Sequence, residues 1–231
     1  MHREKPGVAL LYGVTGSGKT SVYIRLIRQA LEEGKSALLL VPEIALTPQL
    51  LGKLTSHFGR QVAVLHSSLR VGERFDEWRR IQSGEARVVV GTRSAVFAPA
   101  ENLGLILVDE EQEHTYKSEN APRYHAREVA IYRGVQEGTL VVLGSATPSV
   151  ESMYFARSGV YSLYTMRQRY NGQTLPAVEI VDMKQELRNG NPASISGALE
   201  ERLRENILSG RQSILFLNRR GNSRCLVCVE C

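Results

Sequence analysis

The sequence predicts an α/β fold in which a mostly parallel sheet is covered by helices on both faces. Short apolar segments alternate with amphipathic helical patterns along the first two thirds of the chain. The apolar segments lack a polar face, which is typical of strands buried on both sides of a parallel sheet. A glycine-rich loop also joins the first apolar segment to the first helical pattern. These observations predict a single α/β lobe over residues 1–158.

Within this lobe the expected elements alternate in order. The first strand, 8–12, leads through the glycine-rich loop into a helix that ends at Gly34. Five further strands are expected, at 36–41, 61–65, 87–91, 104–108 and 140–144. Three further helices are expected, at 46–57, 72–82 and 125–136.

Residues 159–192 differ from the lobe because they are more polar and contain only one strand-like segment, 177–182. We interpret them as a linker. Residues 193–231 then begin a second unit, with a helix at 196–208 and a strand at 213–217. This unit stops before a second sheet could form.

Composition excludes several classes of protein. Of 231 residues, 42% are hydrophobic and 23% are charged, as in an ordinary globular protein. The longest apolar runs, 37–41 and 103–108, are far shorter than the ~20 residues of a membrane-spanning helix, and no signal peptide is recognisable. We therefore expect a cytoplasmic protein with no membrane partner. The net charge of +5 permits a nucleic acid partner but does not by itself indicate one.

The glycine-rich loop matches the pattern G-x-x-x-x-G-K-[ST] in full. Its residues are Gly13, Val14, Thr15, Gly16, Ser17, Gly18, Lys19 and Thr20. Such a loop wraps its backbone N–H groups around phosphates at the start of a helix, where the helix dipole adds positive charge. Lys19 would reach the β and γ phosphates, and the Thr20 hydroxyl would bind Mg²⁺. The alternative is a glycine-rich turn with a surface lysine.

Two carboxylates, Asp109 and Glu110, follow the apolar segment 105–108. A phosphate-loop enzyme needs a metal-binding aspartate at this place. Glu110 would orient or deprotonate the attacking water, which favours hydrolysis over phosphoryl transfer to a small molecule. The alternative is a solvated acidic loop, because Glu111 and Glu113 continue the acidic run.

Six motifs carry a resemblance to a known family. In order they are GVTGSGKT, LVPEIALTPQL, GTRSAVFAP, VDEEQ, GSATPS and LFLNRRG. Over nearly its whole length the chain resembles the primosomal replication-restart DNA helicases, within the large group that includes the DEAD-box helicases. The resemblance implies a P-loop, RecA-like ATP-binding lobe at 1–158 and a linker at 159–192. It also implies that 193–231 are the truncated start of a second lobe and of a zinc-binding insertion.

The implied activity is ATP-driven 3′-to-5′ DNA unwinding at stalled forks and D-loops. ATP and Mg²⁺ would be the cofactors, with Zn²⁺ in the complete protein. The implied partners are single-stranded, forked and D-loop DNA, primosome proteins and single-strand-binding proteins. Because the later helicase motifs and their arginine finger are missing, we expect the chain alone to be a fragment that unwinds nothing.

The resemblance also assigns roles to residues. Catalysis falls to Lys19, Asp109 and Glu110, and Mg²⁺ binding to Thr20 and Asp109. Coupling of hydrolysis to DNA movement falls to Gln112, Ser145, Ala146 and Thr147. Gln112 stands where the family usually has histidine, and it cannot become a cation.

Single-strand contacts are implied for Pro42, Glu43, Thr92 and Arg93, and the alternative is ordinary loop structure at strand ends. The loop 111–124 interleaves aromatic and basic residues, which can stack on bases and bind phosphates. From it we expect DNA contacts by Tyr116, Lys117 and Arg123. The alternative is a solvated loop whose rings pack on the lobe.

The cysteines all lie at the end of the chain, at 225, 228 and 231. Cys228 and Cys231 fall where the family has its first zinc cysteine pair. A structural zinc site needs four ligands, so we expect this site to be incomplete in the chain.

Two other functions remain open from the sequence. One is a P-loop nucleotide kinase or signalling switch, and the other is a non-catalytic remnant that holds nucleotide or DNA.

Overall fold

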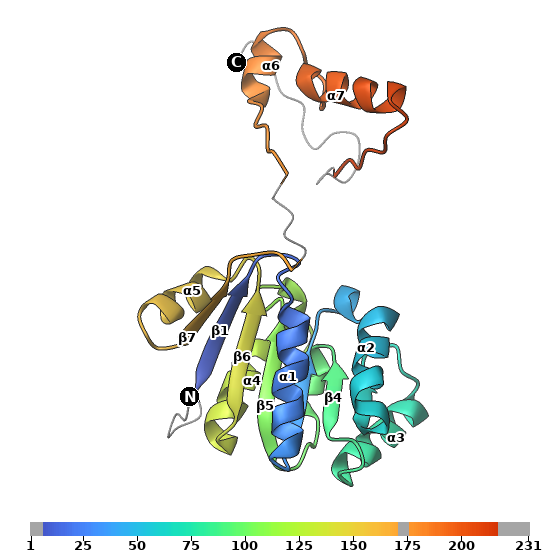
Figure 1. Ribbon diagram of the computed structural model, residues 1–231, viewed down its shortest axis with the longest axis vertical. Coiled ribbons are helices and arrows are strands. Elements are labelled where there is room, and N and C mark those ends of the chain that lie inside the picture. The colour runs from blue at the N-terminus through green and yellow to red at the C-terminus, as the bar shows by residue number, and fades with distance from the viewer. Residues whose placement is uncertain (1–6, 171–175, 217–231) are drawn as a thin grey trace. The chain divides into compact units, whose positions relative to one another are not determined.

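The computed structural model describes residues 7–170 and 176–216 (Figure 1). The chain divides into two compact units, 1–174 and 175–231. The first unit carries the glycine-rich loop and the acidic residues.

The first unit is built on a seven-stranded sheet in the order β3-β4-β2-β5-β6-β1-β7. Every neighbouring pair of strands is parallel. The strands are β1 Val8–Gly13, β2 Ser36–Leu40, β3 Val62–Leu65, β4 Val88–Gly91, β5 Leu103–Asp109, β6 Leu140–Ser145 and β7 Ser162–Met166. The α/β fold and the six expected strands are confirmed.

Helices cover both faces of this sheet. They are α1 Lys19–Glu32, α2 Pro48–Phe58, α3 Val71–Gln82, α4 Ala126–Glu137 and α5 Val150–Arg157. Local signals fix their ends: Thr47 accepts a hydrogen bond from the Leu50 backbone at the start of α2, and Gly138 ends α4 in the left-handed conformation. The expected helices 46–57, 72–82 and 125–136 are confirmed to within two residues. The α5 helix was not expected.

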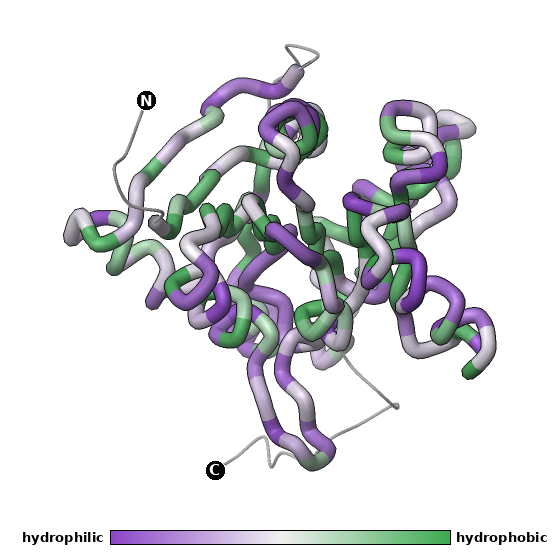
Figure 2. Tube along the Cα trace, turned by 90° about the horizontal axis from the view of Figure 1, so that it is seen from below, coloured by the Kyte–Doolittle hydropathy of each residue, from purple (hydrophilic) through white to green (hydrophobic). Residues whose placement is uncertain are grey.

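The core lies in two layers, one on each face of the sheet. Alternate residues of β2 belong to different layers: Leu38 and Leu40 pack with residues of α3, α4 and α5, whereas Leu39 packs with residues of α1 and α2. Figure 1 accordingly shows α1 in front of the sheet and α4 behind it. In Figure 2 the hydrophobic segments run through the strands, and the connecting loops are mostly hydrophilic.

The sheet extends beyond the expected end of the lobe at residue 158. Residues 162–166, which we assigned to the linker, form β7 and pair with β1 from Ala9↔Ser162 to Gly13↔Met166. β7 is an edge strand whose side chains are half-buried or exposed. Because it is not buried on both faces, its sequence lacks the apolar run that marks the other strands.

The second unit contains two helices among its described residues, α6 Met183–Arg188 and α7 Gly197–Leu208. Ser196 caps α7 by accepting a hydrogen bond from the Leu199 backbone, which confirms the expected helix. The strand expected at 177–182 is not formed. The strand expected at 213–217 is not formed over residues 213–216, and residue 217 lies outside the described residues. A strand needs a neighbour to pair with, and the described part of this unit offers none. Across both units, no described helix has the length and apolar character needed to span a membrane.

Candidate functional site

The carboxyl ends of three adjacent strands bring the predicted catalytic residues together. β6 lies between β5 and β1, so Asp109, Ser145 and Gly13 stand at one edge of the sheet. The register pairs Asp109 with Gly144, and Tyr12 with Ser145. Open α/β sheets bind their ligands at this edge.

The glycine-rich loop has the backbone that its sequence predicts. Gly16 and Gly18 have φ angles of 77° and 91°, a region that favours glycine. Gly18 is the residue before α1, so the loop leads directly into the positive end of that helix. The loop is tightly closed, because a Cβ added at Gly13 would lie 2.6 Å from the Ser17 hydroxyl.

Lys19 and Glu110 face one another across the site. The Lys19 ammonium donates a hydrogen bond to the Gly13 carbonyl at 3.1 Å and lies 3.9 Å from a carboxylate oxygen of Glu110. The Glu110 side chain is 34% exposed, so solvent reaches it. Its φ of 46° is unusual for a residue with a side chain, and such strain is often found at functional sites.

Asp109 is held by two tyrosines that the sequence analysis did not identify in these roles. The Tyr23 hydroxyl donates to a carboxylate oxygen of Asp109 at 2.7 Å, and the Tyr116 hydroxyl donates to its backbone carbonyl at 2.6 Å. Gly144 leaves room for Tyr23, since a Cβ there would lie 1.7 Å from the hydroxyl. Burial raises the pKa of Asp109, against the hydrogen bond from Tyr23 and the charge of Lys19, which lower it.

Gln112 connects the acidic turn to the turn after β6. Its amide nitrogen donates to Glu110 at 3.1 Å, and its amide oxygen accepts from the Ser145 hydroxyl at 2.6 Å. The Ser145 hydroxyl in turn accepts from the Thr147 backbone at 2.8 Å. An unbroken chain of contacts thus leads from Lys19 through Glu110 and Gln112 to Ser145 and Thr147. Ala146 lies between these last two residues in the sequence.

Glu111 has a different environment from Glu110. It is fully buried and accepts hydrogen bonds from Arg127 at 2.7 Å, from the Ser149 backbone at 2.7 Å and from the Ser152 hydroxyl at 3.0 Å. These contacts join the acidic turn to α4 and α5. The sequence showed only an acidic run and did not distinguish this structural glutamate from its half-exposed neighbour Glu110.

The residues expected to contact single-stranded DNA lie elsewhere on the same edge, after β2 and β4. Pro42 is buried, and Glu43 is exposed and accepts from the Ser67 hydroxyl at 3.2 Å. Thr92 is buried, and its backbone donates to the Leu65 carbonyl at 3.0 Å. Since β2 and β4 lie on the far side of β5 from β1, the structure does not bring these residues to the glycine-rich loop.

Arg93 contacts the protein itself. One nitrogen of its guanidinium donates to the carbonyls of Thr115 and Lys117, at 3.1 and 2.6 Å. These carbonyls flank Tyr116 in the single-turn helix η4, His114–Tyr116. Arg93 therefore links the end of β4 to the loop that holds Asp109.

The prediction that Tyr116 contacts DNA is wrong for this structure. Tyr116 is 1% exposed, and its hydroxyl is bonded to Asp109, so its ring has no free face for a base. Lys117 and Arg123 are exposed. Tyr124 packs edge-on against Phe97, with ring centres 4.9 Å apart. At these aromatic residues, the alternative of rings packed on the lobe is the one observed.

No group of three or more His, Cys, Asp or Glu side chains in the described part of the chain could hold a metal ion by itself. The zinc prediction for Cys228 and Cys231 lies outside the described residues.

Comparison with known proteins identifies the family. Residues 5–154, more than half of the chain, match the DEAD/DEAH box helicases. Replication restart protein PriA of Bacillus subtilis is 54% identical over 97% of this chain and 28% of that protein. The PriA of Treponema pallidum is 47% identical over 96% of this chain and 33% of that protein. The chain thus spans about a third of the length of these curated relatives.

Solved structures agree on the fold. RecG bound to a three-way DNA junction has a TM-score of 0.56 at 23% identity, covering 90% of this chain and 26% of RecG. The Hef helicase domain of Pyrococcus furiosus has a TM-score of 0.51 at 20% identity, covering 73% of this chain and 36% of that one. On the strength of the match over residues 5–154, the chain belongs to the DEAD/DEAH box helicase family, and within it the chain is homologous to one part of the replication restart protein PriA.

Proposed function

We propose that this chain is the ATP-hydrolysing part of a 3′-to-5′ DNA motor for replication restart. The observation that carries the proposal is the chain of contacts from Lys19 through Glu110 and Gln112 to residues 145–147. It joins a phosphate-binding loop to a second turn of the same sheet edge, as a motor requires if a change at the nucleotide is to move another segment.

As a DEAD/DEAH box helicase, the chain binds ATP. We assign the phosphates to the loop 13–20, where the backbone N–H groups and Lys19 stabilise negative charge. Glu110 is the only one of the adjacent glutamates Glu110 and Glu111 that solvent reaches, and we assign it the orientation of the attacking water. Gln112 keeps its carboxylate in place.

The residues at the site fit Mg²⁺. The Asp109 carboxylate is half-buried, and desolvation raises its pKa. The Thr20 hydroxyl offers a second oxygen donor in the first turn of α1. Mg²⁺ prefers oxygen ligands and keeps several waters, so a carboxylate and a hydroxyl suffice beside the nucleotide phosphates. The ion would neutralise charge on the transferring phosphate. In that state Asp109 remains ionised, and Tyr23 holds its orientation.

We assign DNA contacts to the exposed members of the predicted set, Glu43, Lys117 and Arg123, and backbone contacts to the turns at Pro42 and Thr92. We no longer propose Tyr116 as a DNA contact. We propose that the main role of Arg93 is to hold η4 in position. Forked DNA, primosome proteins and single-strand-binding proteins are proposed partners of the complete protein. Zinc at Cys228 and Cys231 and a cytoplasmic location stay predictions.

The test is DNA-stimulated ATP turnover. In the complete protein, Lys19→Ala should weaken ATP binding and abolish turnover, because the loop loses the ammonium that stabilises the phosphates. Lys35→Ala is the matched control, since Lys35, whose side chain is 44% exposed, lies just before β2 at the opposite edge of the sheet. Turnover that single-stranded DNA does not stimulate, in a chain that still binds ATP, would favour the non-catalytic remnant over the motor.

A further inference from the structure

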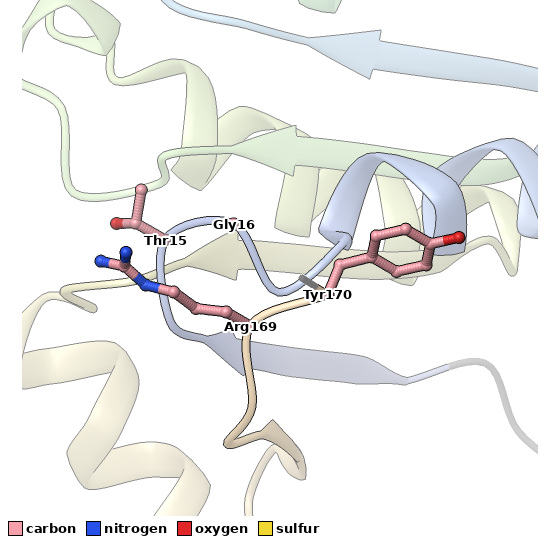
Figure 3. A pocket seen from close by; sticks show the side chains of 4 residues that line it. All are labelled: Thr15, Gly16, Arg169 and Tyr170. Atoms are coloured by element: carbon pink, nitrogen blue, oxygen red, sulfur yellow. The ribbon is translucent and has the colours of Figure 1, made fainter. Parts of the chain in front are cut away.

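The segment that follows β7 crosses the glycine-rich loop. The backbone of Val14 donates to the Met166 carbonyl at 3.2 Å, and the backbone of Tyr170 donates to the Gly16 carbonyl at 2.9 Å. Figure 3 shows this segment running beside the loop, with the Arg169 side chain extending toward Thr15 and the Tyr170 ring on the other side of Gly16. The position of Tyr170 is therefore set by the loop itself.

A pocket lies between the loop and this segment. It is lined by Thr15, Gly16, Arg169 and Tyr170 and has a volume of about 310 Å³. Small-molecule pockets usually measure about 300–1,000 Å³. This one therefore suits a part of a nucleotide and not the whole of it.

The order of the strands indicates which part of the nucleotide the pocket would hold. Lys19 and Glu110 face each other on the side of β1 where β6 and β5 lie. In the proposed ATP site, this pair lies at the terminal phosphate. β7 lies on the opposite side of β1, and the pocket follows β7. A nucleotide whose terminal phosphate lies toward Glu110 extends its nucleoside end toward the pocket.

Tyr170 has the chemistry to receive a nucleobase. Its side chain is 91% exposed, although its backbone is tied to Gly16. Tyrosine rings stack on bases at low cost in conformational entropy when they are already held in place. We propose that Tyr170 stacks on the base of the bound nucleotide and so determines the preference for a nucleotide over phosphate alone. This inference rests on the proposed ATP site.

The experiment compares two ligands that share the phosphate chain. Calorimetric titration of the full chain gives dissociation constants for Mg²⁺-ATP and for Mg²⁺-tripolyphosphate. Tyr170→Ala should weaken ATP binding about tenfold, the size of one base–aromatic stack, and leave tripolyphosphate binding unchanged. Tyr170→Phe, which keeps the ring, should bind ATP as the parent does. Tyr132→Ala is the control, because Tyr132 is 65% exposed on α4.

The outcomes separate this inference from the proposed ATP site. Lys19→Ala should weaken both ligands, which tests the phosphate loop alone. Equal losses for both ligands in Tyr170→Ala would show that Tyr170 acts only through the shape of the loop and would overturn the inference. A parent chain that binds the two ligands equally tightly would also overturn it while leaving the phosphate site intact. A parent chain that binds neither would contradict both proposals.

Discussion

The two halves of the sheet's carboxyl edge are built differently. At the ends of β5, β6 and β1, here called the nucleotide half, charged and polar side chains contact one another: Lys19 contacts Glu110, Glu110 contacts Gln112, and Gln112 contacts Ser145. At the ends of β3, β4 and β2, here called the DNA half, the turns are held mainly through backbone groups, such as Thr92 to Leu65.

The difference follows from what each half would bind. A phosphoryl-transfer site needs charges fixed in position before the reaction, because reorganisation at the moment of reaction costs rate. Sequence-independent binding to a DNA backbone needs exposed positive groups and little else. Arg93 joins the halves. It follows β4 and donates hydrogen bonds to the carbonyls on both sides of Tyr116, and the Tyr116 hydroxyl donates to Asp109.

The largest effect on stability is expected in the nucleotide half. Glu111→Ala should lower the free energy of unfolding by about 3–5 kcal/mol, because it leaves the guanidinium of Arg127, only 13% exposed, without its main partner. Urea denaturation measures this change. Glu113→Ala, in the same turn, should change stability by less than about 0.5 kcal/mol. Equal effects of the two substitutions would mean that the buried Glu111 network is not what joins the turn to α4 and α5.

The link between the halves should contribute less. Arg93→Ala should lower the free energy of unfolding by about 1.5 kcal/mol without any DNA present, since two hydrogen bonds from a charged group are lost. Arg123→Ala, in the same loop and exposed, should leave stability unchanged. If Arg93→Ala keeps full stability and only weakens DNA binding, then Arg93 is a DNA contact, as its motif implies, and not a link.

The smallest effect is expected at the exposed loop residues after β5 that we propose as DNA contacts. Lys117→Ala should weaken binding of single-stranded DNA equally for all sequences and reduce the slope of log affinity against log salt by about 1. Filter binding over a series of salt concentrations measures this slope, with Lys35→Ala as the control. A change confined to one DNA sequence would show that Lys117 reads bases.

The sequence predicts well what depends on local pattern. Six strands are apolar enough to be recognised. The glycines at 16 and 18 indicate the loop because few other residues accept their backbone angles. The edge strand β7 was missed because half-buried residues carry no such pattern.

The parts of the site that were missed depend on contacts between distant residues. Tyr23 meets Asp109 across 86 positions, and Ser145 meets Gln112 across 33. Nothing in the acidic run distinguishes the buried Glu111 from the half-exposed Glu110, since burial is decided by how α4 and α5 pack against the turn. The role of Tyr116 could not be predicted for the same reason, because the sequence pattern of an aromatic residue in a polar loop fits a base-stacking ring as well as a core residue.

We propose that Glu110, and not its buried neighbour, serves the hydrolytic step. The test measures ATP binding and DNA-stimulated ATP turnover of the complete protein carrying Glu110→Gln, beside Glu101→Gln, which changes an exposed glutamate in the turn before β5. Glu110→Gln should bind ATP as the parent does and hydrolyse it at least about a hundredfold more slowly, while Glu101→Gln should match the parent in both. Turnover at the parental rate in Glu110→Gln would show that Glu110 does not serve the hydrolytic step.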